Sequence, residues 1–245
     1  MYEINIFSNK LLQNGENLPE NYLTGESAEK LYGICERLEK FSKLFNLTAI
    51  TEPEEVIKKH IIDCLYLACQ IEKLSEGKGG NILDVGSGAG FPSLPTGAVL
   101  PQFSVTALDS TAKKIGYIKE TADVLGISDF DAIVGRAEDI ARTDKREAFD
   151  FVTARAVARL SVLCELCIPF VKVGGYFVSM KGAAADEEIK EAEKAVKTLG
   201  CQFIDCVPYS ISGLPDKRFL VIYKKISSTN GKYPRNFSQI SKKPL

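Results

Sequence analysis

The sequence lacks any long apolar run, and this absence excludes membrane-spanning proteins. No uninterrupted apolar stretch in its 245 residues approaches the ~20 residues needed to cross a bilayer. The segment from Met1 to Lys10 also lacks the order of a secretory signal, in which basic residues precede an apolar stretch. We therefore expect a cytoplasmic protein with no membrane partner.

A disulfide framework and a metal cluster are also poorly supported. The chain has seven cysteines, an odd number without secretory context, which favours reduced thiols. Cys164 and Cys167 have the spacing of metal ligands, but no second pair with this spacing follows and their neighbours are apolar. We interpret them as small core residues and expect no metal.

The net charge of −1 indicates no particular partner, but the distribution of charge is informative. From Lys217 to the C-terminus there are eight basic residues and no acidic one, whereas residues 1–216 hold 23 basic and 32 acidic residues. Either an anionic partner that contacts the C-terminal end or a solvated tail explains this asymmetry.

The length and the 45% hydrophobic content suit one sizeable core and a small additional domain. We divide the chain into an N-terminal helical cap (1–76), an α/β domain (77–226) and a basic C-terminal tail (227–245). Within the cap, residues 1–26 hold at most a short helix. An amphipathic helix begins with Ser27 as its N-cap, and a second helix runs from Pro53 to Leu74. The apolar stripe of the first helix is Leu31, Ile34, Leu38, Phe41, Leu44 and Phe45.

Strands and helices alternate after residue 80. We expect strands at 81–85, 103–108, 130–134, 149–153 and 176–180, and helices at 93–100, 111–125, 159–170 and 186–199. Such alternation predicts a mostly parallel sheet covered on both faces, with ligands at the carboxyl ends of the strands. The last two predicted strands, 203–208 and 219–223, would form an antiparallel pair that closes the sheet.

A glycine-rich loop follows the first of these strands. Gly86, Gly88 and Gly90 stand at alternate positions, where glycine lets the backbone adopt positive φ and lets a ligand approach closely. Their G-x-G-x-G order differs from the G-x-G-x-x-G of dinucleotide sites. This difference disfavours a nicotinamide-dependent oxidoreductase.

Two acidic residues narrow the choice of ligand. Asp84 lies just before the glycines, where a carboxylate would repel a phosphate but suits an ammonium or sulfonium group. Asp109 lies 23 residues after Gly86, close to the spacing at which such folds place an acid on ribose hydroxyls. Together these residues predict S-adenosyl-L-methionine as the cofactor.

A set of ordered motifs resembles one known family over nearly the whole chain. The motifs are FNLTAI (45–50), DVGSGAGFPSLP (84–95), VTALDSTAKK (105–114), GRAED (135–139), FDFVTARAVARL (149–160), KVGGYFVSMKG (172–182), LPDKRFLVIYK (214–224) and KYPR (232–235). They resemble the bacterial small-subunit ribosomal RNA methyltransferase G family, formerly called glucose-inhibited division protein B. The resemblance implies a class I, Rossmann-like methyltransferase. It would methylate N7 of a guanine in the decoding-region loop of 16S rRNA, either free or within the small ribosomal subunit.

The resemblance also implies a set of cofactor contacts at the strand ends. They are Gly86 and Phe91 in the first loop, Asp109, Ser110 and Thr111 at the ribose, Ala137 and Glu138 at the adenine, and Arg155 where cofactor and base meet. The glycine pattern itself adds Gly88 and Gly90 to the predicted cofactor contacts. Glu138 could instead cap the helix that follows it. Arg155 could instead form a structural ion pair, with Asp84 or Glu138 as its partner.

No catalytic residue is assigned, because guanine N7 has a lone pair and no proton, so attack on the methyl group needs alignment rather than a base. Thr-Ala-Arg-Ala at 153–156 replaces the Asn-Pro-Pro-aromatic segment typical of exocyclic amine methylation, which disfavours that reaction. The sole histidine, His60, could act as a base, contact RNA or be a buried, hydrogen-bonded side chain. Side chains available to contact RNA are Arg155, Arg159, Lys181, Tyr233 and Phe237.

Two alternative functions remain open. A methyltransferase of the same fold could act on a protein or a small molecule, and it would lack salt-sensitive affinity for RNA. A non-catalytic ribosome-assembly factor could use the fold as an RNA-binding scaffold, although the intact glycine loop and Asp109 argue against it. We expect the protein to be a monomer.

Overall fold

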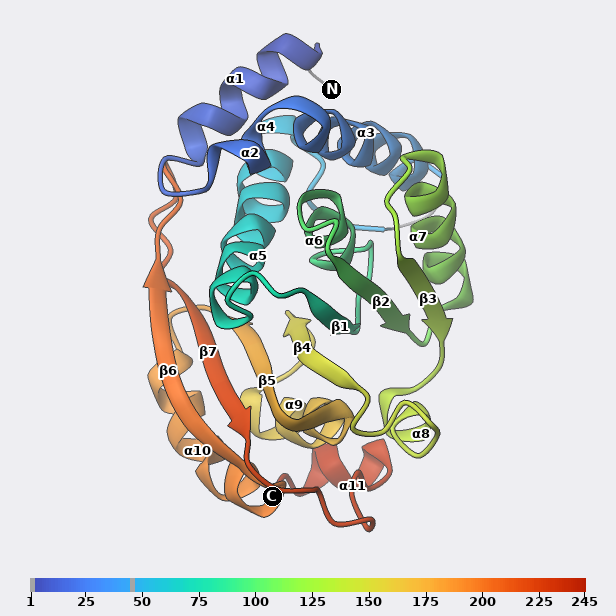
Figure 1. The fold of residues 1–245 in the computed structure, drawn as a ribbon, viewed down its shortest axis with the longest axis vertical. Helices are drawn as coiled ribbons and strands as arrows, with labels where there is room; N and C mark the ends of the chain where they lie inside the picture. The colour runs from blue at the N-terminus through green and yellow to red at the C-terminus, as the bar shows by residue number, and fades with distance from the viewer. Residues whose placement is uncertain (1–2, 45–46) are drawn as a thin grey trace.

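The computed structural model describes residues 3–44 and 47–245. Within these residues, seven strands form one sheet in the order β3-β2-β1-β4-β5-β7-β6 (Figure 1). The strands are β1 (Gly80–Val85), β2 (Phe103–Asp109), β3 (Phe130–Val134), β4 (Phe149–Arg155), β5 (Val171–Lys181), β6 (Cys201–Tyr209) and β7 (Arg218–Lys225). Strands β1 to β5 pair in parallel, and β7 pairs antiparallel with β5 and β6. The predicted α/β class and the antiparallel closing pair are therefore confirmed.

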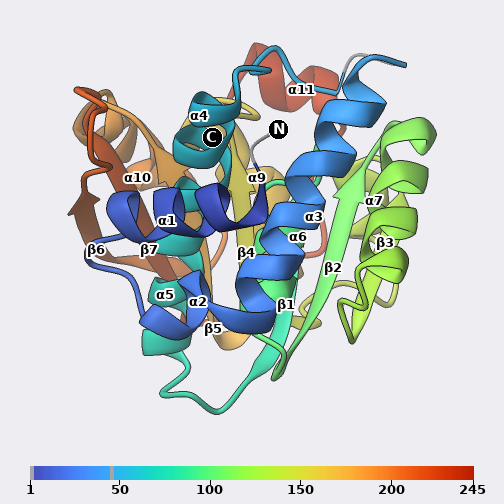
Figure 2. The same ribbon diagram turned by 90° about the horizontal axis from the view of Figure 1, so that it is seen from above.

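Helices cover both faces of the sheet, as Figures 1 and 2 show. The helices on one face are α1 (Ile4–Asn14), α2 (Glu20–Leu23), α3 (Gly25–Ser42), α4 (Pro53–Val56), α5 (Asp63–Leu74), α6 (Ser93–Val99) and α7 (Ala112–Val124). Those on the other face are α8 (Ala137–Ile140), α9 (Leu160–Cys167), α10 (Ala185–Thr198) and α11 (Phe237–Lys242). A buried apolar cluster lies beneath each layer. Burial on both faces explains why the neighbours Ile82 and Leu83 in β1 are both apolar and buried, although their side chains point to opposite faces of the sheet.

The N-terminal residues are more helical than the sequence indicated. Helix α1 has 11 residues and buries Phe7 and Leu11, so the expectation of at most a short helix in residues 1–26 was wrong. The N-cap of α3 is Thr24 rather than Ser27. Because α3 ends at Ser42, Leu44 leaves the predicted stripe and is 70% exposed. Phe45, the last member of that stripe, lies outside the described residues.

Some later elements also differ from their predicted form. Strand β5 begins at Val171, which pairs with Phe149 before an irregularity in register, so the expected turn at 172–175 lies inside the strand. The helix predicted over 159–170 ends at Cys167 and continues as the 3₁₀ segment η2 (Ile168–Phe170). The helix predicted over 53–74 is present, but η1 (Ile57–Ile62) within it is π-helical. Apolar periodicity does not reveal such a widened turn.

The C-terminal basic segment is attached to the rest of the domain. The Lys225 ammonium is fully buried and donates to the carbonyl of Ile168 and to Thr229 Oγ1. Arg235 forms an ion pair of 2.6 Å with the fully buried carboxylate of Glu165. At least these two of the eight basic residues therefore have internal partners and are not available to an external anion.

Candidate functional site

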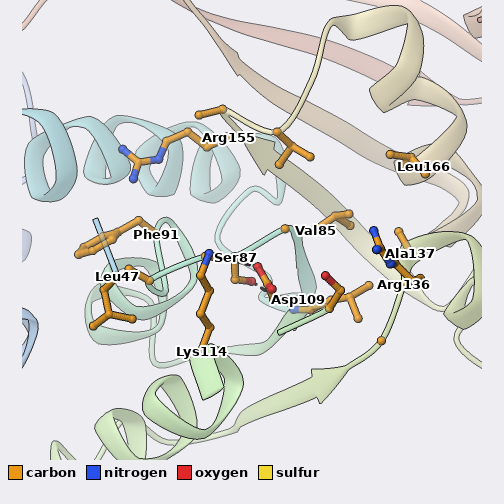
Figure 3. A pocket seen from close by; sticks show the side chains of 18 of the residues that line it. Leu47, Val85, Ser87, Phe91, Asp109, Lys114, Arg136, Ala137, Arg155 and Leu166 are labelled. Carbon is orange, nitrogen blue, oxygen red and sulfur yellow. Dashed lines mark hydrogen bonds between the residues drawn. The ribbon is translucent and has the colours of Figure 1, made fainter. Parts of the chain in front are cut away.

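A cavity of about 440 Å³ lies at the carboxyl ends of the parallel strands, where the sequence predicted a ligand. Loops that follow β1, β2, β3 and β4 contribute to its wall, together with residues from the cap and from α11. In Figure 3, Arg155 and Phe91 lie at one end of this first cavity, and Asp109, Arg136 and Ala137 lie toward the other. The residues predicted as cofactor contacts that line it are Gly86, Gly88, Phe91, Asp109, Ser110, Ala137, Glu138 and Arg155.

Two predicted contacts, Gly90 and Thr111, do not line the first cavity. Gly90 has a φ of +88°, and a Cβ there would lie 2.4 Å from a methyl group of Leu94. The absence of a side chain at Gly90 therefore allows the loop to pack against α6, and it is not needed for the close approach of a ligand. Thr111 is the exposed N-cap residue of α7, and its backbone N–H donates to Asp109 Oδ1 at 2.8 Å. It acts on the cavity through the orientation of Asp109.

Asp109 is oriented by backbone donors from two loops. Its Oδ2 accepts from the N–H of Gly88 at 3.0 Å, and its Oδ1 accepts from the N–H of Thr111. The side chain remains part-exposed at the end of β2, within the first cavity. A carboxylate held in this way can accept hydrogen bonds from a diol. This geometry suits the ribose contact that the sequence predicted.

Gly86 is required at the wall of the first cavity for a steric reason. Its φ is +76°, and a Cβ there would lie 2.6 Å from Cγ2 of Val157, which also lines the cavity. Val157 follows Ala156, a non-glycine residue with a φ of +54°. A left-handed alanine costs about 1 kcal/mol, and such strain is concentrated at functional sites.

Asp84 does not face the cavity, so its predicted contact with a positively charged ligand was wrong. The side chain is 1% exposed, and its Oδ2 accepts from the backbone N–H of Ser93 at 3.2 Å. Burial raises the pKa of this carboxyl from its ordinary value of 3.8 to about 6. Asp84 therefore fixes the start of α6 beneath the glycine loop.

The loop after β3 supplies the far end of the cavity. Ala137 and Glu138 begin the short helix α8, with Arg136 as its N-cap residue, and all three line the cavity. Glu138 lies in the first turn of that helix as well as in the wall, so both interpretations of this residue remain compatible with its position.

Arg155 forms an ion pair, but not with either of the two acids that the sequence suggested. Its partner is Asp63, not Asp84 or Glu138, and the distance from Nη1 to Asp63 Oδ2 is 3.2 Å. Nη1 also donates to the carbonyl of Lys59 at 2.8 Å, and Nη2 donates to Nδ1 of His60 at 3.0 Å. The π-helical segment η1 and the first residue of α5 provide these acceptors. Sequence spacing could not identify a partner that lies 92 residues away.

His60 is a buried, hydrogen-bonded side chain, which is one of the three roles considered from the sequence. A guanidinium cannot accept, so Nδ1 accepts from Arg155 and the ring proton sits on Nε2, 3.0 Å from Thr48 Oγ1. The ring stacks on Phe91 with centroids 4.6 Å apart. Burial and the nearby Arg155 lower the pKa of His60 to about 3, so the ring is neutral near pH 7.

A second cavity of about 810 Å³ lies beyond Arg155 and shares three wall residues with the first. The shared residues are His60, Arg155 and Ala156. Asp63 lies in the second wall, where its Oδ1 accepts from Tyr209 Oη at 2.7 Å and from Arg218 Nη1 at 2.9 Å. Besides Arg155 and Arg218, the second cavity is lined by the basic residues Lys59, Lys181 and Lys217.

Several residues of the first cavity were not predicted from the sequence. Arg136 and Lys114 lie within motifs that carried the family resemblance, and Lys114 extends into the cavity in Figure 3. Phe237, considered before as an RNA contact, lines the same cavity from α11. Leu47, Thr48 and Leu166 carry no chemical signal, because only the fold brings them to the strand ends.

These residues fit S-adenosyl-L-methionine. The cavity combines a carboxylate for ribose hydroxyls, the backbone at Ala137 for an adenine edge and apolar walls from Val85, Leu108 and Leu166. In the described part of the chain, no three His, Cys, Asp or Glu side chains are grouped to hold a metal ion. Cys164 and Cys167 are fully buried in α9, as expected for core residues.

Comparisons with known proteins identify close relatives. A family model described as rRNA small subunit methyltransferase G matches residues 27–210. Proteins called ribosomal RNA small subunit methyltransferase G are similar to this chain in two clostridia. The protein of Clostridium botulinum strain Eklund 17B is 42% identical over 224 residues, which cover 91% of this chain and 92% of the relative. That of Clostridium novyi strain NT is 46% identical over 201 residues, 82% of each chain.

Solved structures support the fold. One neighbour is a candidate sarcosine dimethylglycine methyltransferase from Galdieria sulphuraria, with a TM-score of 0.52 and 12% identity. The alignment covers 67% of this chain and 86% of the neighbour. At this identity the likeness concerns the fold alone, which is that of the α/β methyltransferases.

Proposed function

Because the chain belongs to the rRNA small subunit methyltransferase G family, we propose that it is a 16S rRNA (guanine-N7)-methyltransferase. It transfers a methyl group from S-adenosyl-L-methionine to N7 of a guanine in the decoding-region loop. The single observation that supports this best is the pair of adjoining cavities. One has the groups that suit the methyl donor, and the other is lined by cations and shares Arg155 with it.

The cofactor would be held by groups already in position. Asp109, fixed by the amides of Gly88 and Thr111, binds the ribose hydroxyls, and the backbone at Ala137 binds the adenine. Gly86 and Phe91 line the same cavity, and Phe91 stacks on His60 of the shared wall. When bound, S-adenosyl-L-methionine supplies an electrophilic methyl group on a sulfonium.

The residues of this chain align the reaction rather than transfer protons. Guanine N7 carries no proton, so the neutral His60, with both nitrogens hydrogen bonded, is not needed as a base. With the cofactor bound, the lone pair of N7 would form the new bond to the methyl carbon, and the electron pair of the broken carbon–sulfur bond would stay on sulfur. Rate enhancement then comes from holding N7 in line with that bond.

The test is methyl transfer from labelled S-adenosyl-L-methionine to 16S rRNA and to assembled small subunits. The modified base is mapped by N7-specific strand scission. One guanine modified in the decoding-region loop is the expected result. Cofactor binding without an RNA product would contradict the proposed substrate and direct the search to proteins or small molecules.

We also propose that the protein acts as a cytoplasmic monomer. No helix among the described residues has both the length and the apolar character needed to span a membrane. Light scattering of the purified protein, with and without cofactor, measures the oligomeric state directly. A stable dimer would contradict this part of the proposal.

A further inference from the structure

The guanidinium of Arg155 is held on one side and free on another. It has five N–H donors. Three of them donate to the carbonyl of Lys59, to Asp63 Oδ2 and to His60 Nδ1. Within the residues that the structure describes, no acceptor is bonded to Nε or to the second hydrogen of Nη2. Because three hydrogen bonds to acceptors on η1 and α5 hold the guanidinium, the orientation of the free donors is set before any substrate binds.

We propose that the second cavity receives the target guanine and that Arg155 reads its O6 atom, which makes Arg155 a specificity-determining residue. This inference rests on the proposed function. N7 and O6 lie side by side on the same edge of guanine. A guanine that presents N7 to the cofactor cavity must present O6 to the adjoining wall, which consists of His60, Arg155 and Ala156.

Of these three residues, Arg155 has the donors that suit O6. Both ring nitrogens of His60 are engaged, with Arg155 and with Thr48. Ala156 has no polar side chain. Adenine carries an amino group where guanine carries O6, so its N–H donors would face the N–H donors of Arg155. The same contact that binds guanine therefore rejects adenine.

The rest of the second cavity fits a nucleotide. Its volume of about 810 Å³ lies within the range of small-molecule sites. Nε of Arg218 is buried without a hydrogen-bond partner. Asp63 already accepts from Arg155, Arg218 and Tyr209, so its charge is shared between two guanidinium groups. Lys181 is bound by Glu188 and the carbonyl of Ala158, and Lys59 is paired with Glu55. This leaves Arg218 and Lys217 as the cations best placed for a phosphate.

The experiment varies the base and the protein together. Four 16S rRNAs are prepared with guanosine, inosine, 2-aminopurine or adenosine at the target position. Inosine keeps N7 and O6 and lacks the 2-amino group, whereas 2-aminopurine keeps N7 and the amino group and lacks O6. Equilibrium binding is measured in the presence of S-adenosylhomocysteine, so the result does not depend on the nucleophilicity of N7.

The wild-type protein should bind inosine RNA within about threefold of guanosine RNA. It should bind 2-aminopurine and adenosine RNA about 10- to 100-fold more weakly, because each lacks the acceptor for a charged donor. Arg155→Met should reduce this discrimination to about twofold. The matched control is Lys217→Ala in the same cavity, which should weaken all four RNAs by one common factor.

Two results would overturn the inference: equal binding of inosine and 2-aminopurine RNA by the wild-type protein, or full discrimination in Arg155→Met. Calorimetry with S-adenosyl-L-methionine would show whether Arg155→Met is folded. If it is not, the comparison of inosine and 2-aminopurine RNA with the wild-type protein still tests the inference. Failure of the wild-type protein to methylate guanosine RNA or small subunits would instead refute the proposed function. Methylation without dependence on O6 would refute the role of Arg155 alone.

Discussion

The two cavities that share Arg155 are built in different ways. The first takes most of its wall from short segments that follow successive strands, such as the loop from Gly86 to Phe91 and the turn at Asp109 and Ser110. The second collects side chains from the helical cap, from β4 and β5 and from the segments around β6 and β7. Asp63 and Arg218, which form an ion pair there, are 155 residues apart.

Because of this difference, we expect different kinds of substitution to impair the two cavities. In the first, close approach of the backbone matters, so steric changes should abolish binding. In the second, a buried carboxylate orients two guanidinium groups, so loss of charge should disturb both stability and activity. The predictions below test whether the two cavities can be impaired separately.

The largest effect is expected for Gly86→Val. A side chain at this φ of +76° is strained, and its Cβ would lie 2.6 Å from Val157. Affinity for S-adenosyl-L-methionine, measured by calorimetry, should fall by more than about 100-fold (~2.7 kcal/mol). The matched control is Gly88→Ala, whose Cβ would meet nothing nearer than 3.9 Å and which should bind more tightly than Gly86→Val. Unchanged affinity in Gly86→Val would contradict the placement of the cofactor.

Asp63→Asn should impair the second cavity while the first continues to bind cofactor. The carboxylate is 4% exposed and neutralises Arg155 and Arg218, so its loss leaves cations without a counter-ion. We expect the free energy of unfolding in urea to fall by about 3 kcal/mol. Methyl transfer should fall more than cofactor affinity does.

The control for this change is Asp150→Asn. Asp150 pairs with Lys172 on the surface, where the two side chains are 36% and 39% exposed. Its removal should lower the free energy of unfolding by less than about 1 kcal/mol. Equal effects of the two substitutions would mean that the buried carboxylate has no special role in the second cavity.

Asp84→Asn should change the pH dependence of stability rather than ligand binding. The native carboxyl, with a pKa of about 6, retains its proton to higher pH than the unfolded one. The native state therefore binds more protons between about pH 4 and pH 6, so its free energy of unfolding falls as pH rises through that window, by about 2–3 kcal/mol. An asparagine stays neutral, so the variant does not show this fall in the free energy of unfolding.

Urea unfolding of both proteins at several pH values tests this effect. At each pH the free energy of unfolding of wild type is subtracted from that of Asp84→Asn, and this subtraction cancels the contributions of other groups. The difference should rise in favour of the variant from pH 4 to pH 7 and remain constant above pH 7. Parallel curves would show that Asp84 ionises freely in the folded protein.

The contrast between the cavities also explains what the sequence could predict. The positions of the strands, the glycine loop and Asp109 followed from local patterns, because apolar runs and turn residues act within a few positions of themselves. Asp84 was predicted in the strand but given the wrong role, since sequence does not show which face of a strand end is buried. The partner of Arg155 depends on a π-helical turn and on the docking of the cap, neither of which leaves a periodic signal.

Arg159→Ala should have the smallest effect, although Arg159 lies close to Arg155 in sequence and was a candidate RNA contact. Its guanidinium is 51% exposed and already pairs with Glu187 at 2.9 Å and Glu191 at 2.8 Å. Two carboxylates cancel its attraction for phosphate, and an exposed pair contributes less than about 1 kcal/mol to stability. We expect 16S rRNA methylation within about twofold of wild type, whereas Lys217→Ala should lower it further. A larger loss in Arg159→Ala would extend the RNA-binding surface beyond the second cavity, to the start of α9, where Arg159 is the N-cap residue.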